Sequence, residues 1–300
     1  MYTSHFGLHE LPFSITPDTS FYFACSSHQE ALNTLLVAVR SGEGFIKVTG
    51  EVGTGKTLLC RKFLNALDKE DIVTAYIPNP YVGPMTLLLG VADELGIEYP
   101  ERLNQHQLLK ALTRYLLEVH GNGKRVVVCL DEAQALPIET LEAVRLLSNL
   151  ETERRKLLQV VLFGQPELNR KLNNPAIRQL KQRITFSCAL VPLGFVDVEY
   201  YLAHRLNVAG YRGPRLFTDA AIRRLHRVSL GIPRVINILA HKAMLAAYGE
   251  GVLQADVLHV KAAVQDTEAL PGRNPLIRYV AAALTLLLIS ASALVWSGFA

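Results

Sequence analysis

The feature that most constrains this chain is one loop of eight residues, namely Gly50, Glu51, Val52, Gly53, Thr54, Gly55, Lys56 and Thr57. It fits the phosphate-binding pattern G-x-x-x-x-G-K-[ST] at every fixed position. Glycines let backbone N–H groups turn toward a phosphate, and the start of a following helix adds a favourable dipole. Lys56 would pair with β and γ phosphates, and the Thr57 hydroxyl would ligate Mg²⁺. The loop and Leu58 just after it are therefore the predicted nucleotide-binding residues.

The apolar runs around this loop predict strands that alternate with helices. Strands are expected at residues 45–49, 71–77, 126–130 and 159–163. Helices are expected at residues 58–67, 85–95 and 108–119. The run VVVCL at 126–130 is apolar throughout, which is typical of a strand covered on both faces of a parallel sheet. We therefore expect residues 1–190 to form an α/β domain, a doubly wound parallel sheet of the P-loop NTPase type.

After Pro192 the pattern changes to helices without strands between them. These helices are expected at residues 196–209, 218–229, 232–248 and 254–266. Thr218 and Asp219 supply capping chemistry at the start of one of them. Residues 191–268 are thus expected to be a small all-α lid domain, followed by a basic linker at 269–278.

The last segment, residues 279–300, contains no charged side chain. Tyr279 and Trp296 bracket a core that would be about 26 Å long as a helix, and aromatic residues favour the two membrane interfaces. Arg273 and Arg278 precede it, so the positive-inside tendency places the large domain in the cytoplasm. We expect a single C-terminal transmembrane helix in contact with membrane lipid. The alternative is a buried core helix, which usually carries a polar stripe.

Three polar residues after the predicted strands suit hydrolysis. Asp131 and Glu132 follow VVVCL directly: Asp131 suits Mg²⁺, and Glu132 suits the attacking water. Gln165 follows the strand at 159–163, and it would lie beside the γ phosphate if that strand neighbours the one before Asp131. As a bare residue, Gln165 could equally belong to a turn.

Two arginines could stabilise the charge of a transferred phosphate. Arg183 precedes a short apolar run and could reach the nucleotide of a neighbouring subunit, with Arg178 as its rival. Arg234 opens a helix of the second domain and could fold back onto the γ phosphate. An isolated arginine is more often a solvated surface residue.

Composition narrows the classes of function that remain. A net charge of +4 over 300 residues gives little independent support for a nucleic-acid partner. The four cysteines are scattered, with no C-x-x-C pair and no zinc-ligand spacing. The amino terminus lacks the basic and then apolar run of a signal peptide, so we expect the bulk of the protein to stay in the cytoplasm.

Taken together, GEVGTGKT, VVVCLDEAQ, FGQPEL, LKQRI and GIPRVIN resemble the AAA+ class of P-loop ATPases, and within it the general secretion pathway protein A (ExeA-type) family. The opening YTSHFGLHELPFSITPDTSFYF is similar to that family's amino-terminal signature. The resemblance covers residues 2–266 and implies ATP and Mg²⁺ as ligands. It also implies that Gln165 is the sensor 1 residue, Arg183 a trans-acting arginine finger and Arg234 the sensor 2 residue of the lid.

Many secretion-type members continue into a periplasmic peptidoglycan-binding domain, whereas this sequence stops after the apolar segment. It is in that respect more similar to the ATPases of mannose-sensitive haemagglutinin (MSHA) type IV pilus biogenesis. The resemblance implies a single-pass protein of the bacterial inner membrane that hydrolyses ATP to drive assembly of a type IV pilus or type II secretion-related machine. Homo-oligomers through ATP interfaces, and inner-membrane assembly proteins, are the implied partners.

Two other readings compete with this one. The first is a DNA-associated regulator of the transposition target-selector type, in which Arg223, Arg224 and Arg227 would contact phosphates. Those arginines more simply solvate a helix face, so we expect no nucleic-acid partner. The second is a nucleotide-binding scaffold with very slow hydrolysis, against which the presence of both Asp131 and Glu132 argues.

Overall fold

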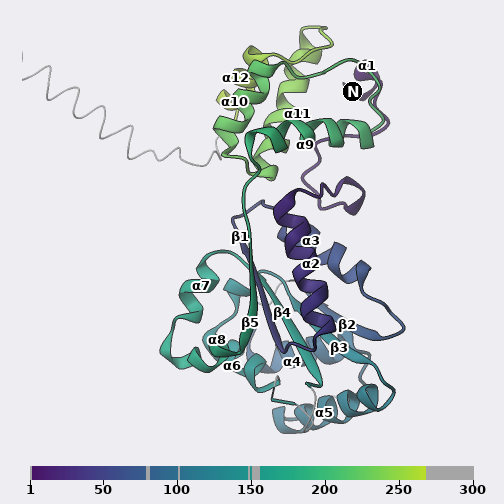
Figure 1. Ribbon diagram of the computed structural model, residues 1–300, viewed down its shortest axis with the longest axis vertical. Coiled ribbons are helices and arrows are strands. Elements are labelled where there is room, and N and C mark those ends of the chain that lie inside the picture. The colour runs from purple at the N-terminus through teal and green to yellow at the C-terminus, as the bar shows by residue number, and fades with distance from the viewer. Residues whose placement is uncertain (1, 79–81, 101, 148, 151–155, 268–300) are drawn as a thin grey trace, which may run out of the picture.

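The computed structural model describes residues 2–78, 82–100, 102–147, 149–150 and 156–267, which form a lower α/β part and an upper helical part (Figure 1). The lower part is built on a five-stranded sheet of order β2-β3-β4-β1-β5, with every neighbouring pair parallel. The strands are β1 (Phe45–Gly50), β2 (Ile72–Ile77), β3 (Arg125–Leu130), β4 (Leu158–Gly164) and β5 (Ile184–Leu190).

Helices cover both faces of this sheet. Side chains alternate along β1, so Phe45 belongs to one hydrophobic core while Ile46 and Val48 belong to the other. One face is covered by α2 (Ser26–Arg40) and α3 (Lys56–Ala66). The opposite face carries α4 (Pro84–Glu94), α5 (Gln105–Gly121), α6 (Ile138–Leu147), α7 (Glu167–Leu172) and α8 (Arg178–Arg183). This arrangement confirms the predicted doubly wound parallel sheet.

The upper part is a bundle of four helices, which we call the helical bundle. They are α9 (Phe195–Val208), α10 (Asp219–Ser229), α11 (Pro233–Gly249) and α12 (Val257–Gln265). All four helices were predicted, three of them with bounds correct to one residue. The helix α12 begins three residues later than expected because the Asp256 side chain caps it, accepting the N–H groups of Leu258 and His259.

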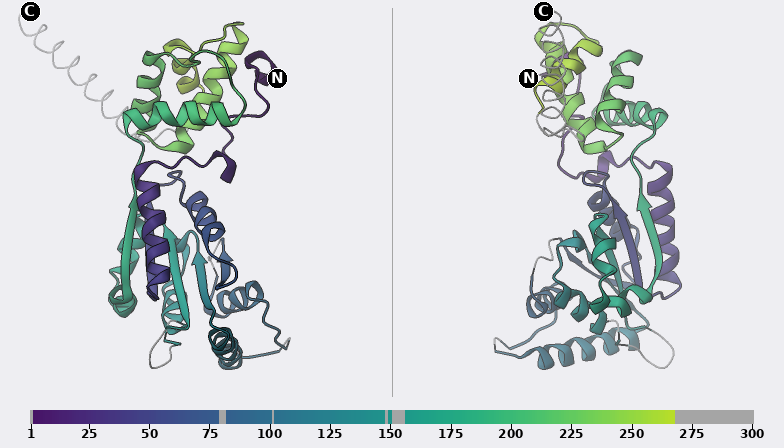
Figure 2. Two further views of the ribbon diagram at one scale, coloured as in Figure 1. Left: turned by 45° about the vertical axis from the view of Figure 1, so that its right-hand side comes forward. Right: turned by 90° about the vertical axis from the view of Figure 1, so that its left-hand side faces the viewer.

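The amino-terminal segment packs on the helical bundle rather than on the sheet (Figure 2). The short helix α1 (Tyr2–Phe6) and the residues after it bury Tyr2, Phe6, Phe13 and Phe21 in one core with α9, α10 and α11. The Tyr2 hydroxyl also lies 2.8 Å from Nδ1 of His241. We expected the α/β domain to begin at residue 1, whereas the aromatic side chains of this segment belong to the core of the bundle.

The described residues contain no helix that is both long and apolar enough to cross a membrane. The predicted linker at 269–278 and the predicted transmembrane helix at 279–300 lie outside the described residues.

Candidate nucleotide-binding site

The glycine-rich loop runs from the end of β1 at Gly50 to the start of α3 at Lys56. Gly53 and Gly55 have φ angles of 84° and 94°, in the left-handed region that favours glycine. A Cβ atom at Gly50 would lie 2.7 Å from Oγ1 of Thr54, a buried side chain that donates to the Glu51 carbonyl. The loop therefore keeps its shape only with these glycines, as the sequence pattern predicted.

Lys56 is held inside this loop. Its side chain is 5% exposed, and Nζ donates to the carbonyls of Gly50 at 2.8 Å and Glu51 at 3.0 Å. Burial lowers the pKa of the Lys56 ammonium, while the negative charges of Glu132 and Asp131 oppose that shift. The ammonium thus lies at the start of a helix, where an anion is favoured.

Thr57 and Asp131 meet although β4 lies between β1 and β3, so the strand before Asp131 is not the immediate neighbour of β1. The Thr57 hydroxyl donates to Oδ2 of Asp131 at 2.6 Å, and the Tyr76 hydroxyl donates to the same oxygen at 3.3 Å. Burial raises the pKa of the Asp131 carboxyl, and the hydrogen bond from Thr57 opposes this. A hydroxyl and a carboxylate are the hard oxygen donors that Mg²⁺ prefers, so the pair fits this ion.

The backbone conformation of Glu132 sets the direction of its side chain. Its φ of 50° is a left-handed value that only one other non-glycine residue among the described residues adopts, and its N–H donates to Oδ1 of Asp131 at 2.9 Å. Gln165 Nε2 donates to Oε2 of Glu132 at 3.1 Å, and Gln134 Nε2 donates to the same oxygen. The side chain of Gln134 also accepts the backbone N–H of Gln165. Gln165 was expected beside the γ phosphate only if the strand before it neighbours the strand before Asp131, and the pairing of β3 with β4 meets this condition. The sequence analysis missed Gln134.

Arg234 joins the helical bundle to the loop. Its backbone N–H donates to the Gly53 carbonyl at 3.2 Å, and a Cβ atom at Gly53 would lie only 2.6 Å from Cβ of Arg234. The amino terminus of α11 is thus seated directly on the glycine loop.

One pocket of ≈ 180 Å³ brings Lys56, Thr57, Glu132 and Arg234 together, whereas Asp131 and Gln165 are not among the residues that line it. Its loop end includes Lys56 and Thr57, with Glu132 and Arg234 beside them. Its other end, which the sequence did not reveal, is lined by residues 14–18, by Tyr201 and Arg205 of α9 and by Asn237 of α11. A nucleotide with its phosphates on the loop would extend toward these residues.

Arg183 does not lie in this pocket. It ends α8 directly before Ile184, which pairs with Phe45 at the far end of β1 from Gly50. Any contact between Arg183 and a nucleotide therefore needs the nucleotide of another subunit, which leaves its role as an arginine finger a proposal. The rival Arg178 begins the same helix.

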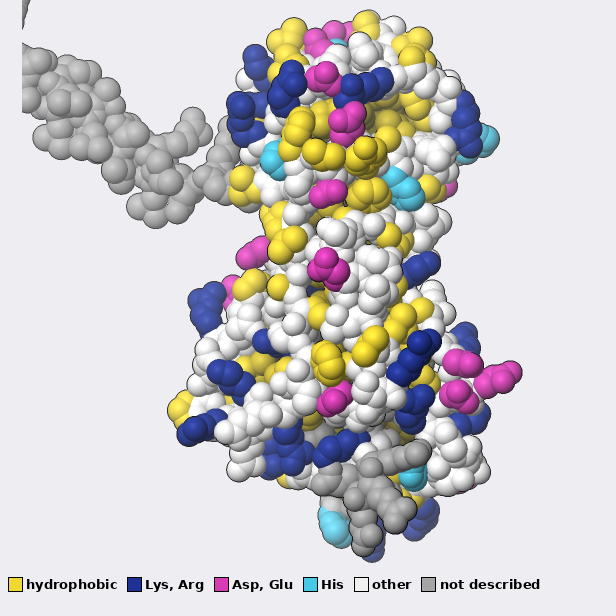
Figure 3. Space-filling model, in the orientation of Figure 1, with side chains coloured by type: hydrophobic (Ala, Val, Ile, Leu, Met, Phe, Trp, Pro, Cys, Tyr) yellow, Lys and Arg dark blue, Asp and Glu magenta, His cyan; other side chains and the backbone are white. Residues whose placement is uncertain are grey.

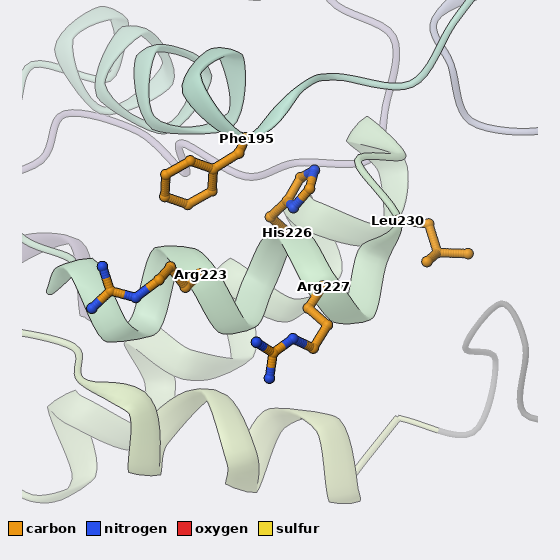
Figure 4. Close-up of a pocket in the computed structure, with 5 residues that line it drawn as sticks. All are labelled: Phe195, Arg223, His226, Arg227 and Leu230. Atoms are coloured by element: carbon orange, nitrogen blue, oxygen red, sulfur yellow. The ribbon is translucent and has the colours of Figure 1, made fainter.

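A second hollow, of ≈ 530 Å³, lies on the helical bundle and shares no residue with the nucleotide pocket (Figure 4). Arg223, His226 and Arg227 reach it from α10, and Phe195 and Leu230 make part of it apolar. Hydrophobic side chains beside lysines and arginines are visible on this part of the surface in Figure 3. Arg223 and Arg227 are exposed, but phosphate groups alone would leave the apolar side chains without a contact.

The fold and the site together define a P-loop protein with an AAA-type fold. Residues 39–172 match the family described as AAA domain. General secretion pathway protein A from Aeromonas hydrophila is 46% identical to this chain over 251 residues, 84% of this chain. The match covers 46% of that protein, so the chain spans about half the length of the curated relative that it matches. These findings support nucleotide binding and an ATPase activity.

Solved structures of the same fold include three of the ORC and Cdc6 type. Cdc6p from Pyrobaculum aerophilum has a TM-score of 0.67 at 19% identity, covering 85% of this chain and 70% of that one. Drosophila ORC bound to DNA has a TM-score of 0.65 at 16% identity, covering 84% and 63%. The Aeropyrum pernix ORC2 protein, solved as ADPNP–ADP complexes, has a TM-score of 0.60 at 18% identity, covering 85% and 72%. At these identities the likeness concerns the fold alone.

Proposed function

We propose that this chain is a membrane-anchored cytoplasmic ATPase that binds and hydrolyses Mg²⁺-ATP to drive assembly of an MSHA-like type IV pilus or a type II secretion-related machine. The observation that carries the enzymatic part is the convergence of Lys56, Thr57 and Glu132 at one pocket, with Asp131 hydrogen-bonded to Thr57. These are the groups that phosphoryl transfer to water needs: a cation for the phosphates, oxygen ligands for Mg²⁺ and a carboxylate for the water.

Each side chain has a distinct role in this proposal. The loop N–H groups and Lys56 bind the β and γ phosphates, and Thr57 and Asp131 hold the metal ion, which neutralises phosphate charge when bound. Glu132 orients the attacking water and accepts its proton, while Gln134 and Gln165 fix the carboxylate. Arg234, on the helix seated against Gly53, stabilises charge on the γ phosphate.

The cellular role rests on the relative and on the sequence. The secretion protein from Aeromonas hydrophila supports a secretion or pilus assembly partner. The uncharged segment at 279–300, with arginines before it, supports a single-pass anchor in the bacterial inner membrane. ATP binding would hold α11 on the loop, where it already lies, and hydrolysis would release it, so the nucleotide would act as a conformational switch for the assembly partner.

Oligomers formed through the ATP sites are part of the same proposal, because Arg183 cannot serve the pocket of its own subunit. The test is the ATPase rate per molecule and the molecular mass of the full chain across protein concentrations, with and without ATP. We expect a rate that rises with concentration and an ATP-dependent oligomer that Arg183→Ala abolishes; loss of the oligomer in Arg178→Ala instead would assign the finger to Arg178. A monomer with a constant rate per molecule would rule out the shared site.

A DNA-associated regulator is the second candidate, since Arg223 and Arg227 are exposed and a fold relative is an ORC structure bound to DNA. That function predicts salt-sensitive binding of the chain to duplex DNA, lost in Arg223→Ala/Arg227→Ala. The apolar lining contributed by Phe195 and Leu230 favours a protein partner at this surface instead.

A further inference from the structure

Residues 12–18, which we call the strap, run between the helical bundle and the α/β part. The strap residues 14–18 line the nucleotide pocket together with residues of the glycine loop. Hydrogen bonds tie the strap to both parts of the molecule, at its two ends. A nucleotide in the pocket would contact the strap, and a shift of the strap would reach the helical bundle through these hydrogen bonds.

One end of the strap is fastened by Arg205 of α9 and Asn237 of α11. Arg205 Nε donates to the Pro12 carbonyl at 2.5 Å, and Arg205 Nη2 donates to the Ser14 carbonyl at 3.2 Å. Asn237 Nδ2 donates to the same Ser14 carbonyl, also at 3.2 Å. The Tyr201 hydroxyl links the two side chains, accepting from Arg205 and donating to Oδ1 of Asn237.

The other end of the strap is fastened to α3, the helix that begins with Lys56. Arg61 Nη1 donates to the Pro17 carbonyl at 2.9 Å. Two helices of the bundle and the helix of the phosphate loop therefore hold a single stretch of backbone, which lies against the pocket between them.

An arginine is an unusual residue at this buried position. It is 5% exposed, and its hydrogen bonds in the described part of the chain go to two backbone carbonyls and a hydroxyl rather than to a carboxylate. A buried guanidinium is costly unless its donors are satisfied, and here they are satisfied by the strap, with the Phe21 ring 4.6 Å away. A planar fork can bind two carbonyls at once, which a lysine ammonium does less well.

We propose that Arg205 is a positioning residue which, with Asn237, holds the strap as the wall for the base of the bound nucleotide and so couples base binding to the helical bundle. This inference rests on the proposed function. The phosphates occupy the loop end of the pocket, which directs the base toward residues 14–18 and Asn237. Arg205 also lines the pocket, but its hydrogen bonds go to the strap and to Tyr201, so we assign its effect on the nucleotide to the strap.

The test compares two probes on the full chain: ATP, and inorganic tripolyphosphate, which has the same phosphates but no base. Arg205→Ala is expected to weaken ATP binding about tenfold or more, as loss of hydrogen bonds from a charged group implies, and to leave tripolyphosphate binding within about twofold. Arg205→Lys should resemble Arg205→Ala, because the charge remains but the fork is lost. Arg215→Ala is the matched control: Arg215 pairs with Glu199 and Asp219 and does not line the pocket, so both affinities should stay at the wild-type values.

A thermal unfolding curve would reveal whether Arg205→Ala folds. If it does not, Asn237→Ala provides a second test of the same inference. This variant removes one of the two bonds to Ser14 and should lower the affinity for ATP selectively, though by less than Arg205→Ala. Equal weakening of ATP and tripolyphosphate would overturn the inference, because Arg205 would then act on the phosphate end. Unchanged ATP binding in all these variants would also overturn it. A wild-type chain that binds neither probe would instead refute the proposed function.

Discussion

The contact between Gly53 and α11 gives the sharpest test of how the bundle sits on the phosphate loop. In Gly53→Ala the new methyl group would lie 2.6 Å from Cβ of Arg234 and 3.2 Å from Cγ2 of Ile232. Because a Cβ atom moves only with its backbone, α11 has to shift. The φ of 84° adds the cost of a left-handed alanine.

The loss of unfolding free energy expected for Gly53→Ala has two parts. The left-handed conformation costs about 1–2 kcal/mol for a residue with a Cβ atom. Overpacking against α11 adds about 1–3 kcal/mol. Gly42→Ala is the matched control, since Gly42 has a φ of 79° but no atom within 4 Å of the added Cβ. Gly42→Ala should therefore show the first cost alone.

The assay is thermal unfolding of the full chain together with ATP affinity. We expect Gly53→Ala to unfold at a lower temperature than Gly42→Ala, at about 2–4 °C per kcal/mol for a domain of this size. Only Gly53→Ala should weaken ATP binding. Arg234→Gly, which removes the opposing Cβ atom, should recover part of the lost thermal stability in the double variant, but not the ATP affinity, because Arg234 is itself proposed to contact the γ phosphate. Equal destabilisation by the two alanines would refute the seating of α11 on the loop.

Two further predictions concern the chemistry of the pocket. Because burial raises the pKa of Asp131 above its ordinary value in the metal-free site, this carboxylate takes up a proton at higher pH than usual, so Mg²⁺ binding should weaken on the acid side. Thr57→Ala removes a hydrogen bond that lowers this pKa, so the acid limb of the Asp131 titration, followed by NMR in the metal-free chain, should move to higher pH. An acid limb that does not move would contradict the pairing of Thr57 with Asp131. Gln165→Ala should lower kcat about tenfold or more with little change in KM, since it frees the Glu132 carboxylate while leaving the phosphate loop intact; steady-state rates test this, and an unchanged kcat would count against it.

The sequence was sufficient where the chemistry lies in consecutive residues or at the ends of predicted strands. The glycine loop specifies its own backbone, and Asp131 and Glu132 follow a strand whose apolar residues mark it as buried. Gln165 needed one further fact, the pairing of β3 with β4, which no local pattern contains. The residues of the glycine loop, with Asp131 and Glu132, could thus be located from short-range signals.

The strap was not predictable, because its contacts join distant residues. Arg205 and Pro12 are 193 positions apart, and no spacing rule relates them. The aromatic residues of the amino-terminal segment belong to the core of the helical bundle, a placement that no local pattern indicated. Gln134 was visible in the sequence DEAQ, yet its bonds to Glu132 and Gln165 depend on the unusual φ of Glu132.

ATP binding and single-turnover hydrolysis, compared between the wild-type chain and Glu132→Gln, show whether Glu132 activates the attacking water. The account predicts that Glu132→Gln binds Mg²⁺-ATP with wild-type affinity, because Lys56, Thr57 and Asp131 are untouched, and hydrolyses it about 10²–10⁴-fold more slowly, as loss of a general base implies. A variant that binds ATP and hydrolyses it at the wild-type rate would contradict the account, because the water would then be activated by another group.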